Sequence, residues 1–365
     1  MSDTYRSCHS IEGELFFNHL NKVGYCCMLT PNGGQPVLYE NYQGELIDWD
    51  TFFVRRDEHI ELMKKGSSLP ACKDCLWIKD AKWDVRKKEF RYVLLNIWVK
   101  CNLYCIYCSN HKDKNVLNNT KEYNLIPVIR DMIEKKVLTE NTKVDIAGGE
   151  ATLDSHFNEL LFLLIDSGVK NININTNATI FSKSIVEGIK QGVVSLISSV
   201  DSGTPKKFEY IKKKNLWNNV WQNISEYSNN INYKINNNSV RTKFIIIPNI
   251  NSSKSEIFKF ILKSKKANVS GVILNIDLHW LRQNYDDKKT MLDVINLTKY
   301  FIKIANIFDI DWQIWAHIED LIKRYNMIEK SSQIDINFIF EKKKAKKTIL
   351  DKFFFLIIRI LLLTM

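Results

Sequence analysis

Three cysteines stand close together in the sequence, at Cys101, Cys105 and Cys108. They directly follow an apolar run over residues 92–99, which the pattern predicts to be a buried strand. The thiolates would therefore lie on the loop at the carboxyl end of this strand, where three soft ligands suit an iron–sulfur cluster with one iron left open. A zinc site is an alternative, because His111 could complete a Cys3His tetrahedron, and a redox pair is another.

The segments that would position this loop alternate between two patterns. Apolar, β-branched runs typical of strands recur over residues 92–99, 143–147, 171–176, 193–200, 241–248 and 271–278. Amphipathic segments typical of helices lie between them, over residues 122–137, 154–168, 181–191 and 253–267. This alternation predicts a parallel sheet. In barrels built from parallel strands and helices, the catalytic groups lie at the carboxyl ends of the strands.

The second of these strands ends in Gly148-Gly149-Glu150. Paired glycines allow a backbone to approach a ligand closely, and the carboxylate beside them could neutralise an ammonium group. A lone Gly-Gly-Glu sequence is a common turn, but here it ends the strand that follows the cysteine loop. The two motifs are therefore expected to meet at the carboxyl ends of neighbouring strands.

The cysteine loop resembles that of the radical S-adenosylmethionine (SAM) family, whose CxxxCx-aromatic-C loop binds a [4Fe–4S] cluster. Tyr107 fills the aromatic position. In that family the fourth iron is left for the amino and carboxylate groups of SAM, and a GGE motif similar to residues 148–150 holds the methionyl amino group. The resemblance implies an α/β fold, with a TIM-like partial (β/α)6 barrel of parallel strands over residues 86–285.

Polar residues at the ends of the later strands resemble the family's other SAM contacts. Ser199 and Asp201 are similar to positions that contact the ribose, and Asn177 and Asn249 are further candidates. The backbone of Ile273 would face the purine, although core packing explains its side chain equally well. For Asp201 the alternative is an N-cap of the following helix.

Residues 1–85 are expected to form a separate, cysteine-rich unit that holds Cys8, Cys26, Cys27, Cys72 and Cys75. A CxxC pair plus two distant cysteines supplies four soft ligands, which suit either structural zinc or a cluster. The layout resembles the SPASM or twitch modules that carry auxiliary [4Fe–4S] clusters in radical SAM enzymes. The resemblance implies at most one auxiliary cluster, held by Cys8, Cys72, Cys75 and one of Cys26 and Cys27. The alternative is a small module that structural zinc stabilises.

The composition is that of an ordinary globular protein, with 45% apolar and 25% charged residues in 365. The net charge is +11, but no interleaved aromatic and basic pattern is present, so we expect no nucleic-acid partner. The polar N-terminus lacks the apolar segment of a signal peptide. Eight cysteines in a sequence without a visible signal peptide favour metal ligation rather than disulfides, in a reducing, cytoplasmic compartment.

The C-terminal part changes in character along its length. Residues 286–340 are expected to extend the core, with a helix over 289–307 and a final strand over 310–318. Residues 341–365 are first basic and then almost wholly apolar, which suits contact with the surface of an anionic membrane. The alternatives are a helix packed on the barrel and a tail altered by a change of reading frame.

The resemblance implies reductive cleavage of SAM to a 5′-deoxyadenosyl radical, which abstracts hydrogen from a substrate. The expected substrate is a peptide, a protein or a sugar-containing molecule such as a carbohydrate, and the expected reaction is a net oxidation. The expected electron donor is a protein such as flavodoxin or ferredoxin. One alternative is a radical SAM rearrangement or transfer with a purely structural N-terminal metal. Another is a non-catalytic metal-binding scaffold, against which the intact cysteines and GGE motif argue.

Overall fold

The computed structural model describes residues 5–26, 36–67, 69–73, 75, 78–83, 87–108, 122–232, 239–284, 287–329 and 334–335. The chain divides into two compact units. The first comprises residues 1–102, 108–196 and 230–238, and the second comprises residues 103–107, 197–229 and 239–365. Cys101 and Cys108 therefore belong to the first unit, and Cys105 belongs to the second.

The first unit is built on a mixed sheet with the strand order β4-β3-β2-β6-β7-β8. Its strands are β2 (Glu14–Asn18), β3 (Lys22–Gly24), β4 (Val37–Tyr39), β6 (Tyr92–Trp98), β7 (Lys143–Gly148) and β8 (Asn171–Thr176). Strands β2, β6, β7 and β8 run parallel, whereas β3 is antiparallel to both of its neighbours. A second, antiparallel pair joins β1 (Tyr5–Ser7) to β5 (Lys79–Ala81). Strand β9 (Val194–Ser199) is divided between the two units.

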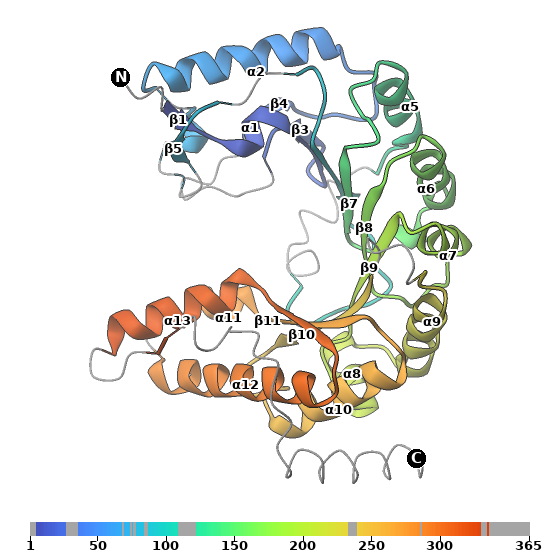
Figure 1. Cartoon of the computed structure of the whole chain (residues 1–365), viewed down its shortest axis with the longest axis vertical. Coiled ribbons are helices and arrows are strands. Elements are labelled where there is room, and N and C mark those ends of the chain that lie inside the picture. Colours follow the sequence, from blue (N-terminus) through green and yellow to red (C-terminus); the bar gives the residue numbers. More distant parts are fainter. Residues whose placement is uncertain are drawn as a thin grey trace. The chain divides into compact units, whose positions relative to one another are not determined.

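Helices cover one face of β6, β7 and β8 in this unit. Its helical segments are α1 (His9–Gly13), α2 (Trp49–Lys64), η1 (Pro70–Cys72), α5 (Ile126–Glu134), η2 (Ala151–Leu153), α6 (Phe157–Asp166) and α7 (Lys183–Lys190). Figure 1 shows α5, α6 and α7 side by side along the strands. The strands bury every second residue, and the alternate face is polar: Asp145 accepts hydrogen bonds from Tyr92 and Asn173. The face of these strands opposite the helices is therefore partly polar.

The N-terminal strands continue the sheet of the core. Residues of β2 pair in parallel with β6, from Glu14 opposite Tyr92 to Asn18 opposite Asn96. Just before them, the Arg91 amide donates to the Gly13 carbonyl at 2.8 Å. The sheet therefore crosses the domain boundary that the sequence predicted between residues 85 and 86.

The second unit carries the parallel strands β10 (Val240–Ile246), β11 (Gly271–Ile276) and β12 (Asp311–Ile314). Its helices are α8 (Pro205–Lys212), α9 (Trp217–Asn229), α10 (Lys254–Lys266), α11 (Leu278–Gln283), α12 (Lys288–Ile307) and α13 (Ala316–Ile328). All residues of β11 are buried, and this strand lies between β10 and β12 and contacts α10, α12 and α13. The strand expected over 310–318 is shorter than predicted, since α13 begins at Ala316.

The predicted fold class is confirmed: the chain is mixed α/β with mostly parallel strands. Each predicted core strand appears, as β6 to β11, and the helix expected over 289–307 appears as α12. Over the part of the chain that the structure describes, no helix combines the length and the apolar character needed to cross a bilayer. Cys27, His111 and the tail over 341–365 lie outside the described residues.

Candidate active site

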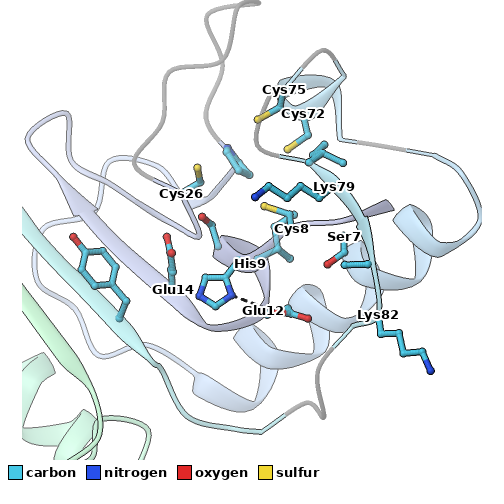
Figure 2. Close-up of a pocket in the computed structure, with 16 residues that line it drawn as sticks. Ser7, Cys8, His9, Glu12, Glu14, Cys26, Cys72, Cys75, Lys79 and Lys82 are labelled. Atoms are coloured by element: carbon cyan, nitrogen blue, oxygen red, sulfur yellow. Dashed lines mark ion pairs between the residues drawn. The ribbon is translucent and has the colours of Figure 1, made fainter. Parts of the chain in front are cut away.

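Four of the five N-terminal cysteines line one pocket of about 540 Å³ in the first unit (Figure 2). Cys8 lies at the start of α1, and Cys26 follows β3. Cys72 ends η1, and the Cys75 amide donates to the Cys72 carbonyl at 3.3 Å, which closes a tight knuckle. The sequence predicted that these cysteines would gather, and the fold brings them to the same pocket.

The electrostatics of this pocket favour neutral thiols in the absence of a cation. Burial raises the pKa of Cys72 to about 11, with contributions from Cys8 and Cys75. Burial also raises the pKa of Cys8, although backbone amides oppose it. A bound metal ion reverses this balance, because it holds thiolates as ligands. In their chemistry, the four thiols of this pocket are the soft donors that zinc and iron–sulfur clusters take as ligands.

The described cysteines form no disulfides with one another. Within the ranges that the structure describes, no three His, Cys, Asp or Glu side chains are arranged to share a metal ion.

At the end of β7, the glycine pair lies against the backbone that leads into the cysteine loop. The Gly149 amide donates to the Trp98 carbonyl at 2.7 Å, and the Glu150 amide donates to the Lys100 carbonyl at 2.8 Å. A Cβ on Gly149 would lie 2.3 Å from the Lys100 carbonyl oxygen, so only glycine permits this approach. The close approach that the sequence predicted is therefore made to the chain just before Cys101.

The carboxylate of Glu150 is bound by its own chain. Its side chain accepts hydrogen bonds from the Thr152 hydroxyl at 2.7 Å, the Thr176 hydroxyl at 2.7 Å and the Asn177 amide at 2.6 Å. Glu150 is only 1% exposed, and burial raises its pKa while these hydrogen bonds lower it. The carboxylate thus fixes the end of β8 beside the end of β7.

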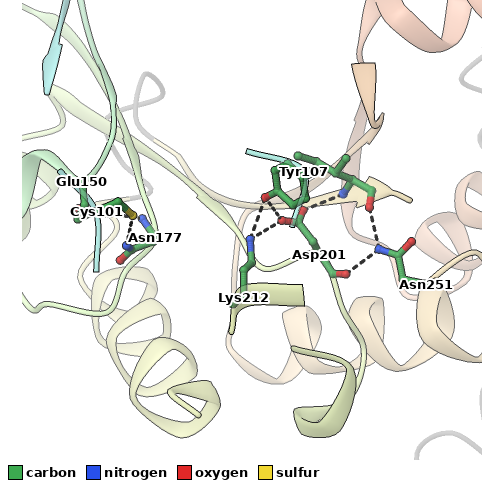
Figure 3. A network of polar contacts seen from close by, with 8 residues as sticks. Cys101, Tyr107, Glu150, Asn177, Asp201, Lys212 and Asn251 are labelled. Carbon is green, nitrogen blue, oxygen red and sulfur yellow. Dashed lines mark hydrogen bonds and ion pairs between the residues drawn. The ribbon is translucent and has the colours of Figure 1, made fainter. Parts of the chain in front are cut away.

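Asn177 connects this carboxylate to the first cysteine (Figure 3). Its side-chain Nδ2 lies 3.5 Å from the Cys101 Sγ and donates to the side-chain Oδ1 of Asn102 at 2.8 Å. Asn102 in turn donates to the Thr179 hydroxyl at 2.8 Å. The carboxyl ends of β6, β7 and β8 therefore meet at the Cys101 thiol, as the sequence predicted for parallel strands.

In the second unit, a buried ion pair holds the aromatic residue of the cysteine loop (Figure 3). The Lys212 Nζ donates to the Asp201 Oδ2 at 2.5 Å and to the Tyr107 hydroxyl at 2.9 Å. Tyr107 donates to the same carboxylate oxygen, and the Ile245 amide donates to the Oδ1 at 2.8 Å. Asp201 is 0% exposed and Lys212 is 1% exposed, so the pair is shielded from water.

The backbone of the loop is held by the same element. The Tyr104 amide donates to the Lys212 carbonyl, and the Ile106 amide donates to the Ile211 carbonyl, both at 3.0 Å. Ile106 and Tyr107 also pack against an apolar cluster that includes Ile211. The segment that carries Cys105 is thus fixed to the end of α8 through both backbone and side chains.

Neither predicted role of Asp201 describes its place in the structure. Thr204 is the N-cap of α8. The Asp201 carboxylate has no exposed surface for a ribose hydroxyl, because Lys212, Tyr107 and Ile245 already bind it. Its φ of +61° is a left-handed conformation that aspartate tolerates better than most residues.

The other predicted SAM contacts lie in different settings. Asn249 is exposed in the turn after β10, where its amide donates to the Ser252 hydroxyl. Ile273 is fully buried in β11, opposite Lys243 of β10 and Gln313 of β12, and its backbone contact with a purine stays a prediction. Ser199 is half-buried at the end of β9.

Lys212 and Asn251 were missed by the sequence analysis. Lys212 belongs to the lysine-rich segment over residues 206–214, but it follows the buried Phe208 by four residues and so shares the apolar stripe of α8. Asn251 donates to the carbonyls of Asp201 and Ile245, both at 2.8 Å. No sequence pattern distinguished it from Asn249.

Comparison with known proteins agrees with this geometry. Residues 95–276 match the family model of the radical SAM superfamily. The GTP 3′,8-cyclase of Vibrio parahaemolyticus is 22% identical over 179 residues, which are 49% of this chain and 52% of that protein. The GTP 3′,8-cyclase of Mannheimia succiniciproducens is 25% identical over 183 residues, or 50% and 52%. The chain spans about half the length of the curated relatives it matches.

Among solved structures, Streptococcus suis SuiB bound to its precursor peptide SuiA is similar with a TM-score of 0.47 and 12% identity. That similarity covers 93% of this chain and 78% of SuiB. The match to the family model includes Cys101, Cys105, Cys108 and the Gly148-Gly149-Glu150 motif. The chain therefore belongs to the radical SAM superfamily.

Proposed function

We propose that this radical SAM protein oxidises a peptide, protein or sugar-containing substrate, with Cys101, Cys105 and Cys108 holding a [4Fe–4S] cluster. The observation that carries the proposal is the contact of Asn177 with the Cys101 thiol, beside the GGE motif. When bound and reduced, the cluster with SAM supplies a 5′-deoxyadenosyl radical that takes a hydrogen atom from the substrate.

The residues of this chain fix the loop for that chemistry. Glu150 holds Asn177, which leaves amide groups rather than a free carboxylate beside the Cys101 sulfur. In the second unit, Asp201 and Lys212 hold Tyr107 and restrict the segment around Cys105. Both sets of contacts limit how the thiolates move, and such preorganisation supports ligand binding.

We propose that the N-terminal pocket holds an auxiliary [4Fe–4S] cluster on Cys8, Cys72, Cys75 and Cys26 or Cys27. These cysteines would hold the cluster, and the cluster would supply an acceptor for the electron of the substrate radical, which would make the reaction a net oxidation. Zinc in the same pocket is the alternative, and it would make the metal structural and the reaction a rearrangement or transfer.

Iron content separates these two cases. We expect about eight irons per chain after anaerobic reconstitution of the wild type, and about four in Cys8→Ser/Cys72→Ser. That variant should still cleave SAM with dithionite, because its loop cysteines are intact. The control Ser7→Ala changes the same pocket without removing a thiol and should keep the full iron content. About four irons and one zinc in the wild type would contradict the auxiliary cluster.

A purine nucleotide is the second candidate substrate, because the matched curated relatives are GTP 3′,8-cyclases. It rests on similarity over about half of their length. GTP added to the reconstituted protein should then be consumed together with SAM, whereas a peptide-modifying enzyme should leave GTP unchanged.

We also propose that an acidic one-electron carrier, such as a flavodoxin, docks beside the cysteine loop in the second unit. Tyr104, next to Cys105, is 54% exposed, and the Lys214 ammonium lies 5.7 Å from its ring centroid. Lys213 lies 4.5 Å from the ring centroid of Tyr210, which is 53% exposed. An acidic partner on this basic and aromatic surface would reach the chain within one residue of a proposed cluster ligand.

Charge reversal at this surface should slow reduction by the protein donor. We expect Lys213→Glu/Lys214→Glu to lower the rate with reduced flavodoxin about tenfold at low salt, and less at high salt. Reduction by dithionite should be unchanged. The control Lys265→Glu/Lys266→Glu makes the same change in net charge at the end of α10. Equal losses in both variants would contradict a local docking surface.

A further inference from the structure

Lys243 stands on the face of β10 that is turned away from the helices. Thr242 bonds to Ser264 of α10 at 2.8 Å, and Phe244 packs on Phe260 of the same helix. Because side chains alternate along a strand, Lys243 projects to the opposite face. Its side chain is half-buried, so solvent still reaches part of it.

The ammonium of Lys243 lies against an aromatic ring. It lies 4.5 Å from the ring centroid of Trp315, which directly follows β12. Within the ranges that the structure describes, it makes no ion pair. The carboxylate of Asp201, which acts on Lys243 electrostatically, is paired with Lys212. Burial lowers the pKa of Lys243 to about 8; the Asp201 carboxylate opposes this shift, and the Lys212 ammonium adds to it.

A histidine and an amide lie near this lysine. Asn275 of β11 is two residues beyond the partner of Lys243 in the parallel register, so it projects to the same face. Its carbonyl oxygen lies 3.1 Å from the Nδ1 of His317, which donates to it. Burial lowers the pKa of His317; Asp320 opposes this, and Arg282 and Lys243 add to it.

The charges around Lys243 leave one positive charge unbalanced. Arg241, on the same face of β10, pairs with Asp311 at 2.8 Å. Lys212 pairs with Asp201, as described above. A protonated Lys243 therefore adds a partly buried positive charge that no described carboxylate pairs with, and an anion would stabilise it.

We propose that Lys243, with Trp315 and the His317–Asn275 pair, forms a binding site for an anionic group of the substrate, either a carboxylate or a phosphate. The Nζ donates charge-assisted hydrogen bonds to the anion, and the indole ring shields the ammonium from water. Asn275 fixes the ring of His317 at the side of the site. Only the assignment of the anion to the substrate rests on the proposed function.

Calorimetric titration of the reconstituted protein with inorganic pyrophosphate, as the probe, tests the site. We expect Lys243→Met to weaken binding about tenfold or more. Lys243→Arg should retain binding, which excludes misfolding as the cause. The control Lys254→Met removes an exposed lysine that also lies near an aromatic ring, Tyr300, and should bind as the wild type does. Equal binding by Lys243→Met and the wild type overturns the proposal.

Binding should also depend on pH. The protonated ammonium is the binding form, so affinity should be highest below pH 8 and fall as the pH rises through the pKa of about 8. Lys243→Arg should remove this fall, because arginine stays charged. If the wild type binds pyrophosphate equally tightly below and above pH 8, the role of Lys243 is overturned.

The carboxylate of SAM is the competing source of the anion. SAM and decarboxylated SAM should bind to Lys243→Met as tightly as to the wild type if the site serves the substrate. If Lys243→Met binds SAM more weakly than the wild type does but binds decarboxylated SAM equally well, the proposal is overturned. The lysine would then bind the carboxylate of the cofactor. Pyrophosphate binding that persists in a protein unable to form 5′-deoxyadenosine would remove the proposed function and leave the anion site standing.

Discussion

Replacing Lys212 with methionine is expected to lower the free energy of unfolding by about 3–5 kcal/mol. The substitution keeps most of the apolar stem but leaves the Asp201 carboxylate buried without its cation. It also removes the hydrogen bond from Lys212 to the Tyr107 hydroxyl. The loss should exceed that of any nearby surface lysine, because neither partner of this pair contacts water.

Anaerobic urea unfolding of the single and double variants measures this cost. Asp201→Asn/Lys212→Met removes both charges and should recover part of the lost stability. The matched control Lys213→Met changes the next residue, which is exposed, and should lie within about 0.5 kcal/mol of the wild type. A cost below about 1 kcal/mol for Lys212→Met would show that the pair does not stabilise the loop.

Replacing Cys105 with alanine is expected to abolish the cluster of the cysteine loop. Two thiolates cannot replace three in holding a site-differentiated cluster, so about four irons per chain should be lost on reconstitution. The matched variant Cys75→Ala removes a thiol from the N-terminal pocket and should leave the loop cluster in place. Visible absorption, iron content and the SAM-perturbed electron paramagnetic resonance signal distinguish the two variants. An unchanged loop signal in Cys105→Ala would contradict the ligand assignment.

The strand and helix alternation was predictable because each element carries its own periodicity. Buried runs such as residues 171–176 and amphipathic segments such as residues 181–191 appear as β8 and α7. The meeting of Glu150 and Asn177 near Cys101 followed from one topological rule, since parallel strands bring their carboxyl ends to the same edge.

The sequence pattern does not predict which distant strands pair with each other. The parallel pairing of β2 with β6 depends on which sheet edge is open, and the pattern of residues 13–17 is the same for a separate hairpin. The roles of Lys212 and Lys243 were hidden for a related reason. Charged residues within basic or alternating segments are usually solvated. Only the three-dimensional neighbours show that Lys212 is buried in an ion pair and that Lys243 is partly buried beside Trp315.

Formation of 5′-deoxyadenosine tests the central claim most directly. The reconstituted wild type is incubated anaerobically with dithionite and SAM, and the products are separated by liquid chromatography. We predict 5′-deoxyadenosine and methionine from the wild type and neither from Cys105→Ala. No 5′-deoxyadenosine from the wild type, or an equal rate from Cys105→Ala, would contradict the radical SAM chemistry proposed for this chain.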